Sequence, residues 1–477
     1  MKITRRRAIE LGLVSGGALL SPFGFPDLAL AQFSPQIPRF EKSFRIPPVL
    51  KPVRSGVTKD ISGKDTPTDY YEIVMKKCQV DILPGVKTDV WSYNGSIPGP
   101  TIRQDRDRLS VVRFINNLDI DTSIHLHGMA SDPEYDGYAE DLIRPGYYKD
   151  YRYPNNRAST LWYHDHAIHN TSRNVYMGLA GMYIVDDGVE QSLNLPHGDY
   201  EIPLIIQDKK FAIDGSLIFD NKQQRGVYGD VMLVNGVPWP RMEVANRKYR
   251  FRVLNAGASR TCQLSLSTGD DLIVIGSDAG LLDAPVRTKI LRIAMAERYG
   301  FIVDFSKYPI GTRVILRNPL FPNNLDTDAR TGEIMCFDVV REESDDSIIP
   351  ETLRKVIRLD PASAVRTRTF RFGLGGGQWL INGQTWNPKR VDANPGFGDI
   401  EIWNLVGAGG GWIHPVHIHL VDLQMLDRNG LRPLPYERGW KDVFYVGENQ
   451  TVRVIAKFAP NRGKYMMHCH NIVHEDR

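Results

Sequence analysis

Three segments of the chain alternate apolar and polar positions with a period of two, and each ends in asparagine. Such alternation predicts strands with one buried and one exposed face. An Asn-Gly pair, typical of a tight turn between strands, precedes each segment. The pairs begin at Asn94, Asn235 and Asn382, and the segments are 111–117, 249–255 and 400–404. The pattern therefore predicts one strand-rich unit that occurs three times.

The spacing of these units indicates domains in series. The asparagines are 141 and 147 residues apart, which is too long for a solenoid repeat. Many short strand-like runs and frequent glycine and proline lie between them, with little helical periodicity, so unrelated hairpins are the weaker interpretation. We expect an all-β protein of three Greek-key sandwich or barrel domains. The expected ranges are a proline-rich arm at 32–51 and domains at 52–190, 200–345 and 365–477.

Composition narrows the class of protein. The 477 residues are 42% hydrophobic and 24% charged, which excludes a disordered chain. The net charge is only +3, no basic block is present, and no nucleic-acid partner is expected. Four cysteines are too few for a disulfide scaffold. Cys78, Cys262 and Cys336 lie in no motif and are interpreted as structural, with pairing of any two left open.

The first 31 residues resemble an export signal. Arg5, Arg6 and Arg7 precede a modestly apolar stretch, and Ala29-Leu30-Ala31 fits a cleavage site. Consecutive arginines favour a twin-arginine signal over a general secretory one. The stretch is too short to span a membrane, and no later window is long and apolar enough. We expect a periplasmic or extracellular protein without a stable membrane anchor.

Ten of the twelve histidines fall into four short clusters, and the other two, His169 and His197, are interpreted as structural. Each cluster contains a His-X-His pair, whose two side chains share one face of a strand. A single pair is a weak signal, but four pairs supply eight imidazoles, too many for one ion and suited to a cluster of three. The pairs are His125/His127, His164/His166, His417/His419 and His468/His470.

Cys469 lies between two of these histidines and therefore points to the opposite face of its strand. There it is available to a different ion, together with His414 and His474. Two imidazoles and a thiolate, usually with a weak axial methionine, are the ligands of a blue-copper centre. Zinc also binds His and Cys, but a zinc site does not need ten histidines in this arrangement.

Several stretches carry a resemblance to a known family: HLHG followed by DGYAED, LWYHDHAIH, NVYMGLAGMYIV, MAERY, GWIHPVHIHLVD and HCHNIVHED. Over essentially the whole mature chain the sequence resembles the multicopper oxidases, most closely the bilirubin oxidases and less closely the bacterial spore-coat laccases. The resemblance implies three cupredoxin domains and four copper ions. It assigns type 1 copper to His414, Cys469 and His474, type 2 copper to His125 and His417, and the type 3 pair to His127, His164, His166, His419, His468 and His470.

The resemblance also implies roles for three further side chains. Asp136 and Glu475 match carboxylates that deliver protons during O₂ reduction, although an Asp before Gly is also common in turns and Glu475 also fits an exposed loop. Trp412 matches a tryptophan that shields the type 1 site, and a core aromatic is the alternative. The axial ligand is expected five residues after His474, beyond Arg477. We therefore expect the third domain to lack its C-terminal end, with an incomplete sequence favoured over a genuine truncation.

The expected activity is oxidation of a small organic donor coupled to reduction of O₂ to water. Phenols, aromatic amines and tetrapyrroles such as bilirubin are the expected donors. A Cu(I) oxidase ranks lower because the 12 methionines are scattered. An exported, non-catalytic cupredoxin scaffold is the alternative from another class, disfavoured because every ligand is present. A copper nitrite reductase is disfavoured because it lacks the paired motifs.

Overall fold

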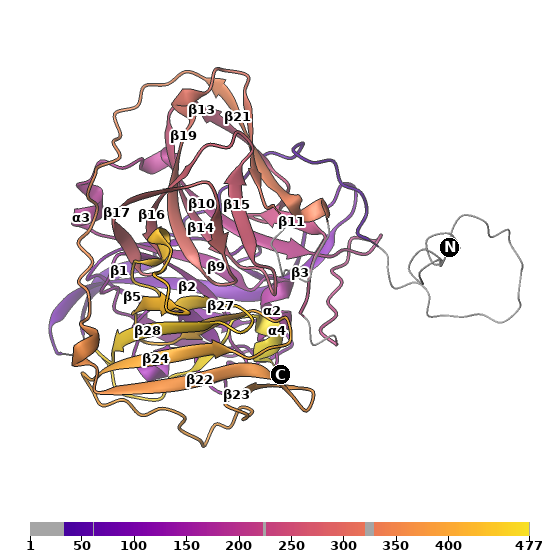
Figure 1. Ribbon diagram of the computed structural model, residues 1–477. Coiled ribbons are helices and arrows are strands. Elements are labelled where there is room, and N and C mark those ends of the chain that lie inside the picture. The colour runs from indigo at the N-terminus through magenta and orange to yellow at the C-terminus, as the bar shows by residue number, and fades with distance from the viewer. Residues whose placement is uncertain (1–32, 61, 223–225, 320–328, 477) are drawn as a thin grey trace, which may run out of the picture. The chain divides into compact units, whose positions relative to one another are not determined.

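The computed structural model describes residues 33–60, 62–222, 226–319 and 329–476. Residues from Ser34 onward form one compact unit, and the all-β prediction is confirmed (Figure 1). The expected export signal at 1–31 lies outside the described residues.

The helices are short: α2 (Thr171–Met177), α3 (Gly188–Gln191), α4 (Ile472–Glu475), η1 (Pro133–Tyr135), η2 (Gly198–Tyr200), η3 (Phe305–Lys307), η4 (Ala329–Gly332), η5 (Pro361–Ser363) and η6 (Pro435–Glu437). Among the residues described, none of the helices combines the length and apolar character needed to cross a bilayer.

The first domain consists of two sheets. One has the order β1-β2-β5-β7, with β3 also paired to β2, and the other has the order β4-β9-β8-β6. The strands are β1 (Arg54–Lys59), β2 (Asp65–Val80), β3 (Thr88–Tyr93), β4 (Ile102–Asp105), β5 (Leu109–Asn116), β6 (Ile124–His127), β7 (Tyr148–Tyr153), β8 (Ser159–Asp165) and β9 (Ala180–Asp186). Strand β6, which carries the first histidine pair, is therefore an edge strand.

The second domain also has two sheets, with the orders β12-β11-β10-β14-β19-β16-β17 and β13-β21-β20-β15-β18. Its strands are β10 (Glu201–Lys209), β11 (Val231–Val234), β12 (Val237–Pro238), β13 (Arg241–Ala245), β14 (Lys248–Asn255), β15 (Cys262–Leu266), β16 (Leu272–Ser277), β17 (Gly280–Thr288), β18 (Leu291–Ile293), β19 (Arg298–Asp304), β20 (Arg313–Arg317) and β21 (Glu333–Arg341). None of the histidine clusters lies in this domain.

The third domain pairs a sheet of order β23-β22-β24-β28-β26 with a small sheet of order β27-β25-β29. Its strands are β22 (Arg366–Gly375), β23 (Gln378–Ile381), β24 (Ile400–Gly407), β25 (His414–Ile418), β26 (Leu423–Arg428), β27 (Val443–Val446), β28 (Thr451–Lys457) and β29 (Met467–Cys469). The small sheet carries the last two histidine clusters.

The three Asn-Gly turns have the same local structure. Asn94, Asn235 and Asn382 all have φ between +50° and +55°, and each is followed by a glycine with positive φ. Each asparagine Oδ1 accepts a hydrogen bond of 2.7–2.8 Å from a backbone N–H, those of Val74, Ile205 and Arg371 respectively. The strand that donates this hydrogen bond pairs in parallel with a strand that follows the turn, as in β2–β5, β10–β14 and β22–β24.

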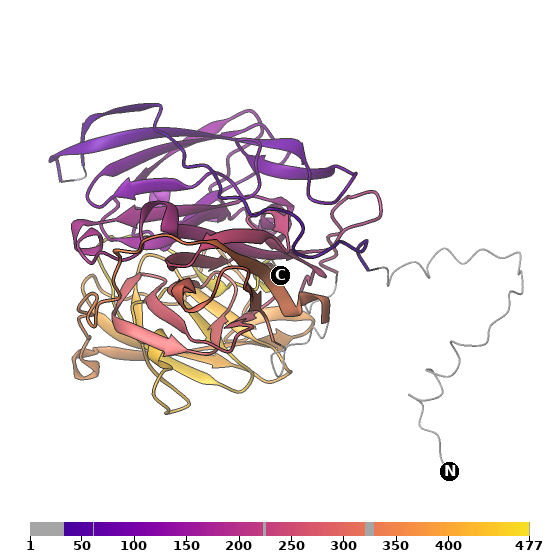
Figure 2. The same cartoon turned by 90° about the horizontal axis from the view of Figure 1, so that it is seen from above.

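Each domain has its own hydrophobic core, and a further cluster joins all three. That cluster contains Trp162 and Val175 of the first domain, Ile205 of the second, and Val443 and Ile472 of the third. Figure 2 shows the violet strands of the first domain and the yellow strands of the third as separate groups. The arm from Ser34 onward is tied to the domains by backbone hydrogen bonds, such as Leu50 N to Thr101 O at 2.8 Å.

Candidate metal centre

The four His-X-His pairs lie on strands that end between the first and third domains. In the first domain β6 pairs with β8, which places His125 opposite His164. In the third domain β25 pairs with β29, which places His417 opposite His468. Since alternate residues share a face, each strand or its immediate extension directs two imidazoles to the same side. All eight rings are buried.

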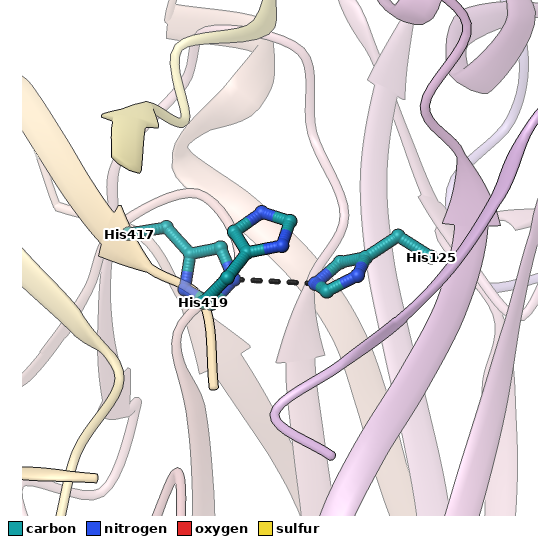
Figure 3. A group of neighbouring side chains, drawn as sticks. All are labelled: His125, His417 and His419. Atoms are coloured by element: carbon teal, nitrogen blue, oxygen red, sulfur yellow. Dashed lines mark hydrogen bonds between the residues drawn. The ribbon is translucent and has the colours of Figure 1, made fainter. Parts of the chain in front are cut away.

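The ligand nitrogens of these rings gather in groups of three, in each of which the atoms lie within 4.8 Å of one another. Two groups are triads without a shared member. The first triad contains His127, His164 and His470, and the second contains His166, His419 and His468. The remaining two rings, His125 and His417, group with His419 (Figure 3).

Backbone carbonyls fix the orientation of His125 and His417. Nδ1 of His125 donates to the carbonyl of Asp136 at 2.5 Å, and Nδ1 of His417 donates to that of Asp442 at 2.9 Å. The two Nε2 atoms, 3.3 Å apart (dashed line in Figure 3), therefore face each other as lone pairs. Two facing lone pairs repel each other unless a cation lies between them.

Two carboxylates contact the outer side of the imidazole group. Oδ2 of Asp136 accepts a hydrogen bond of 2.8 Å from Nδ1 of His419, while its buried Oδ1 has no partner. The Glu475 oxygens lie 3.1 Å from Nδ1 of His468 and 3.4 Å from Nδ1 of His166. Neither carboxylate is in an exposed loop. Burial raises the pKa of Asp136, whereas for Glu475 the imidazoles of His468 and His166 outweigh burial and lower the pKa.

A second site lies on the opposite face of β29. The Sγ atom of Cys469 is 3.4 Å from Nδ1 of His414 and 3.8 Å from Nδ1 of His474. His414 reaches this face because it is three residues before His417 on β25, an odd number of strand positions. All three side chains are buried. The sites are therefore joined by three consecutive residues, His468 to His470.

Two tryptophans cover the second site. Trp379, on β23, stacks on the His474 ring with centroids 3.7 Å apart. Trp412 is partly exposed and packs edge-on against Trp379 at 5.3 Å. Trp412 was predicted from the sequence and Trp379 was not, because nothing in its strand pattern distinguishes it from a core aromatic.

The residues present fit copper. Nδ1 of His127, Nε2 of His164 and both nitrogens of His470 are buried without a hydrogen-bond partner, and these rings form one of the two triads. Burial lowers the pKa of His414 to about 4 and that of His470 to about 3, so both imidazoles stay neutral, the form that binds metals. The thiolate and two imidazoles of the second site are the ligands preferred by a blue-copper ion.

The remaining candidates take no part in either site. Cys78, Cys262 and Cys336 are free thiols, which answers the question of a disulfide that the sequence left open. His169 contacts the Asp476 carbonyl, and His197 contacts that of Leu195. Asp442 lies 3.0 Å from Nε2 of His127 in the first domain and 3.7 Å from Nδ1 of His417 in the third. It was missed by sequence reasoning because no motif surrounds it.

Comparison with known proteins places the chain in a family. Three family models, each described as multicopper oxidase, match residues 74–190, 212–331 and 351–477. A bilirubin oxidase from Albifimbria verrucaria is 43% identical, over 94% of this chain and 81% of that protein. A laccase from Bacillus stratosphericus is 35% identical, over 92% of this chain and 97% of that protein. A crystal structure of a laccase from Pediococcus acidilactici matches with a TM-score of 0.83 and 30% identity, covering 93% of each chain.

The chain belongs to the multicopper oxidase family, and its three domains are cupredoxin-like. It is a copper-binding oxidase that couples oxidation of an organic donor to reduction of O₂, as expected from the sequence. The non-catalytic scaffold is not favoured.

Proposed function

We propose that the chain binds four copper ions, with His414, Cys469 and His474 holding a type 1 ion. His125 and His417 hold a type 2 ion, and the two triads hold the type 3 pair. The observation that carries this proposal is the division of eleven buried ligands into one His₂Cys group, one His pair and two separate His triads. Bound copper supplies one-electron oxidation of the donor at the first site and four-electron reduction of O₂ at the second.

The two carboxylates hold and deliver the protons that reduction of O₂ requires. Asp136 has an unpartnered buried oxygen 3.7 Å from Nδ1 of His125. Glu475 lies 3.1 Å from Nδ1 of His468 and 3.4 Å from Nδ1 of His166. Both are placed to exchange a proton through the imidazole group without being ligands themselves.

The donor is oxidised beside the tryptophan pair. Trp379 contacts His474 face to face, and the partly exposed Trp412 lies next to it, so an aromatic donor has an aromatic surface to pack against. Phenols, aromatic amines and tetrapyrroles such as bilirubin are the donors we propose. The names of the two relatives, laccase and bilirubin oxidase, support this range.

The test uses purified, copper-loaded protein. We expect an intense blue absorption band, about four coppers per chain, and O₂ uptake with a phenol and with bilirubin. The ratio of kcat/KM for the two donors distinguishes laccase-like from bilirubin-oxidase-like use. A colourless protein that binds little copper and consumes no O₂ would overturn the assignment.

The N-terminal segment supports a second proposal, that the protein is exported by the twin-arginine route to the periplasm or the outside of the cell. Its support is the run of Arg5, Arg6 and Arg7 before a modestly apolar stretch. Replacing Arg5, Arg6 and Arg7 by Lys is expected to retain the protein in the cytoplasm. Normal export of that variant would contradict the twin-arginine route.

A further inference from the structure

A cluster of five buried charges lies next to the proposed type 3 site and is not used by the ligand assignment. Its members are Asp278, Glu297 and Arg298 of the second domain and Lys441 and Asp442 of the third, and each is at most 1% exposed. Lys441 Nζ lies 2.8 Å from Asp278 and 3.1 Å from Glu297. Buried charges are costly unless each is paired, and removing one partner leaves the other charge uncompensated.

Within this cluster, Asp442 connects Arg298 to His127. Its Oδ1 accepts hydrogen bonds from Nη1 of Arg298 at 2.6 Å and from Nε2 of His127 at 3.0 Å. Its Oδ2 accepts from Nη2 of Arg298 at 2.5 Å. An ionised carboxylate only accepts, so Nε2 of His127 carries the hydrogen and Nδ1 keeps the lone pair. Nδ1 is the buried nitrogen that has no partner.

Arg298 is itself held by all three domains. Its Nε donates to the carbonyl of Thr160 on β8 at 3.0 Å, and its remaining donors reach the carbonyls of Ala296 and Asp278 as well as Asp442. The residue after His127 is Gly128, with φ +90°. A Cβ atom there would lie 2.7 Å from both Arg298 Nη2 and Asp442 Oδ2. The ion pair therefore packs directly against the backbone that carries His127.

We propose that Asp442, held in place by Arg298, is a positioning residue for His127. The pair fixes the ring so that Nδ1 faces His164 and His470, and it makes assembly of this triad depend on docking of the second domain, which supplies no ligand. This inference rests on the proposed function, since it takes His127 as a copper ligand.

The test compares Asp442→Asn with Glu401→Gln in the full-length, copper-loaded protein. Glu401 is a matched control, because it is also a buried carboxylate of the third domain that accepts two hydrogen bonds from one arginine, Arg368. We expect Asp442→Asn to keep the blue band but to bind one copper about 10- to 100-fold more weakly. The unpaired ion left in the triads should give a Cu(II) electron paramagnetic resonance signal that the coupled pair lacks. Glu401→Gln should match the wild type in both readouts.

The outcomes separate this inference from the proposed function. If the wild type has no blue band and binds little copper, the proposed function fails. If the wild type behaves as expected and Asp442→Asn binds copper with the same affinity and spectrum, the inference fails. Should Asp442→Asn not fold, Arg298→Lys provides the milder perturbation, and normal copper binding by that variant would overturn the inference. A structure of the loaded wild type with copper on Nε2 of His127 would also overturn it.

Discussion

At the scale of single residues, the proposed role of Glu475 in proton delivery is tested by a substitution that keeps the size and shape of its side chain. It contacts two imidazoles of the proposed type 3 site through Nδ1 atoms. An amide in its place retains the shape but does not carry a proton in the same way. We expect Glu475→Gln to lower kcat for O₂ uptake by at least about tenfold.

The same variant should leave the first half of the reaction unchanged. Bleaching of the blue band by a donor without O₂ reports on the Cys469 site, whereas the Glu475 carboxylate faces His166 and His468 of the other site. Glu243→Gln, at a largely exposed carboxylate, serves as the control. A Glu475→Gln enzyme with wild-type kcat would rule out the proton-delivery role.

The sequence predicted these residues unevenly. The eleven proposed ligands and two carboxylates stand in short motifs, where spacing alone indicates which side chains share a face. Asp442 and Trp379 lie in ordinary strand contexts, and their partners are distant in sequence: Asp442 meets His127 across 315 residues. Local pattern carries no information about such contacts, which exist only after the domains have packed.

At the scale of elements, the alternation of β29 separates the two sites. His468 and His470 point to one side and Cys469 to the other, so the thiol is replaceable without removing an imidazole. We expect Cys469→Ser to abolish the blue band and to lower the copper content by about one ion per chain. Cys78→Ser, at a thiol that donates to the carbonyl of Gly95, should retain both. Loss of most copper from Cys469→Ser would contradict independent sites.

Two of the Asn-Gly turns show whether the cost of a substitution comes from the backbone conformation of the turn itself or from contact with a distant residue. Gly236 and Gly383 have nearly the same φ, +75° and +74°. A Cβ at Gly383 meets nothing within 4 Å, whereas at Gly236 it would lie 2.4 Å from the Ile97 carbonyl oxygen. Gly383→Ala should therefore cost about 1 kcal/mol, from its backbone conformation alone. Gly236→Ala should cost about 1–3 kcal/mol more, because the backbone must move.

Thermal unfolding of the two variants side by side provides the measurement. Equal losses in Tm would mean that the contact between Gly236 and Ile97 does not constrain the turn. The turns themselves and the strands after them were predictable from alternation and Asn-Gly pairs. The parallel pairing of β2 with β5, β10 with β14 and β22 with β24 was not, because register between distant strands depends on the whole domain.

At the scale of the whole molecule, one buried lysine links the first two domains. Lys209 on β10 is fully buried and donates to the backbone carbonyl of Tyr176 in α2. Its Nζ also lies 4.6 Å from the centre of the Tyr176 ring. Burial lowers its pKa from 10.5 to about 7. The folded protein therefore favours the neutral amine, while the unfolded chain favours the charged one up to about pH 10.5.

The free energy of unfolding should therefore include a contribution from Lys209 that becomes more favourable as the pH rises. Below about pH 7 the full cost of burying Lys209 is present, and the cost decreases as the pH rises toward 10.5. Lys209→Met should therefore gain most over the wild type near pH 6–7. That gain should shrink by up to about 1.4 kcal/mol per pH unit above this range. The carbonyl left unpaired at Tyr176 adds a penalty that does not vary with pH, so the slope remains diagnostic.

The measurement is the difference in unfolding free energy between Lys209→Met and wild type from pH 6 to 10, with the metal content held equal. Lys457→Met, at an exposed lysine that ends β28, is the matched control and should show no such slope. A difference between Lys209→Met and wild type that stays constant across this range would mean that Lys209 remains charged inside the protein. In that case Asp208, whose charge opposes the effect of burial, would compensate for it in full, and the junction between the two domains would not sense pH.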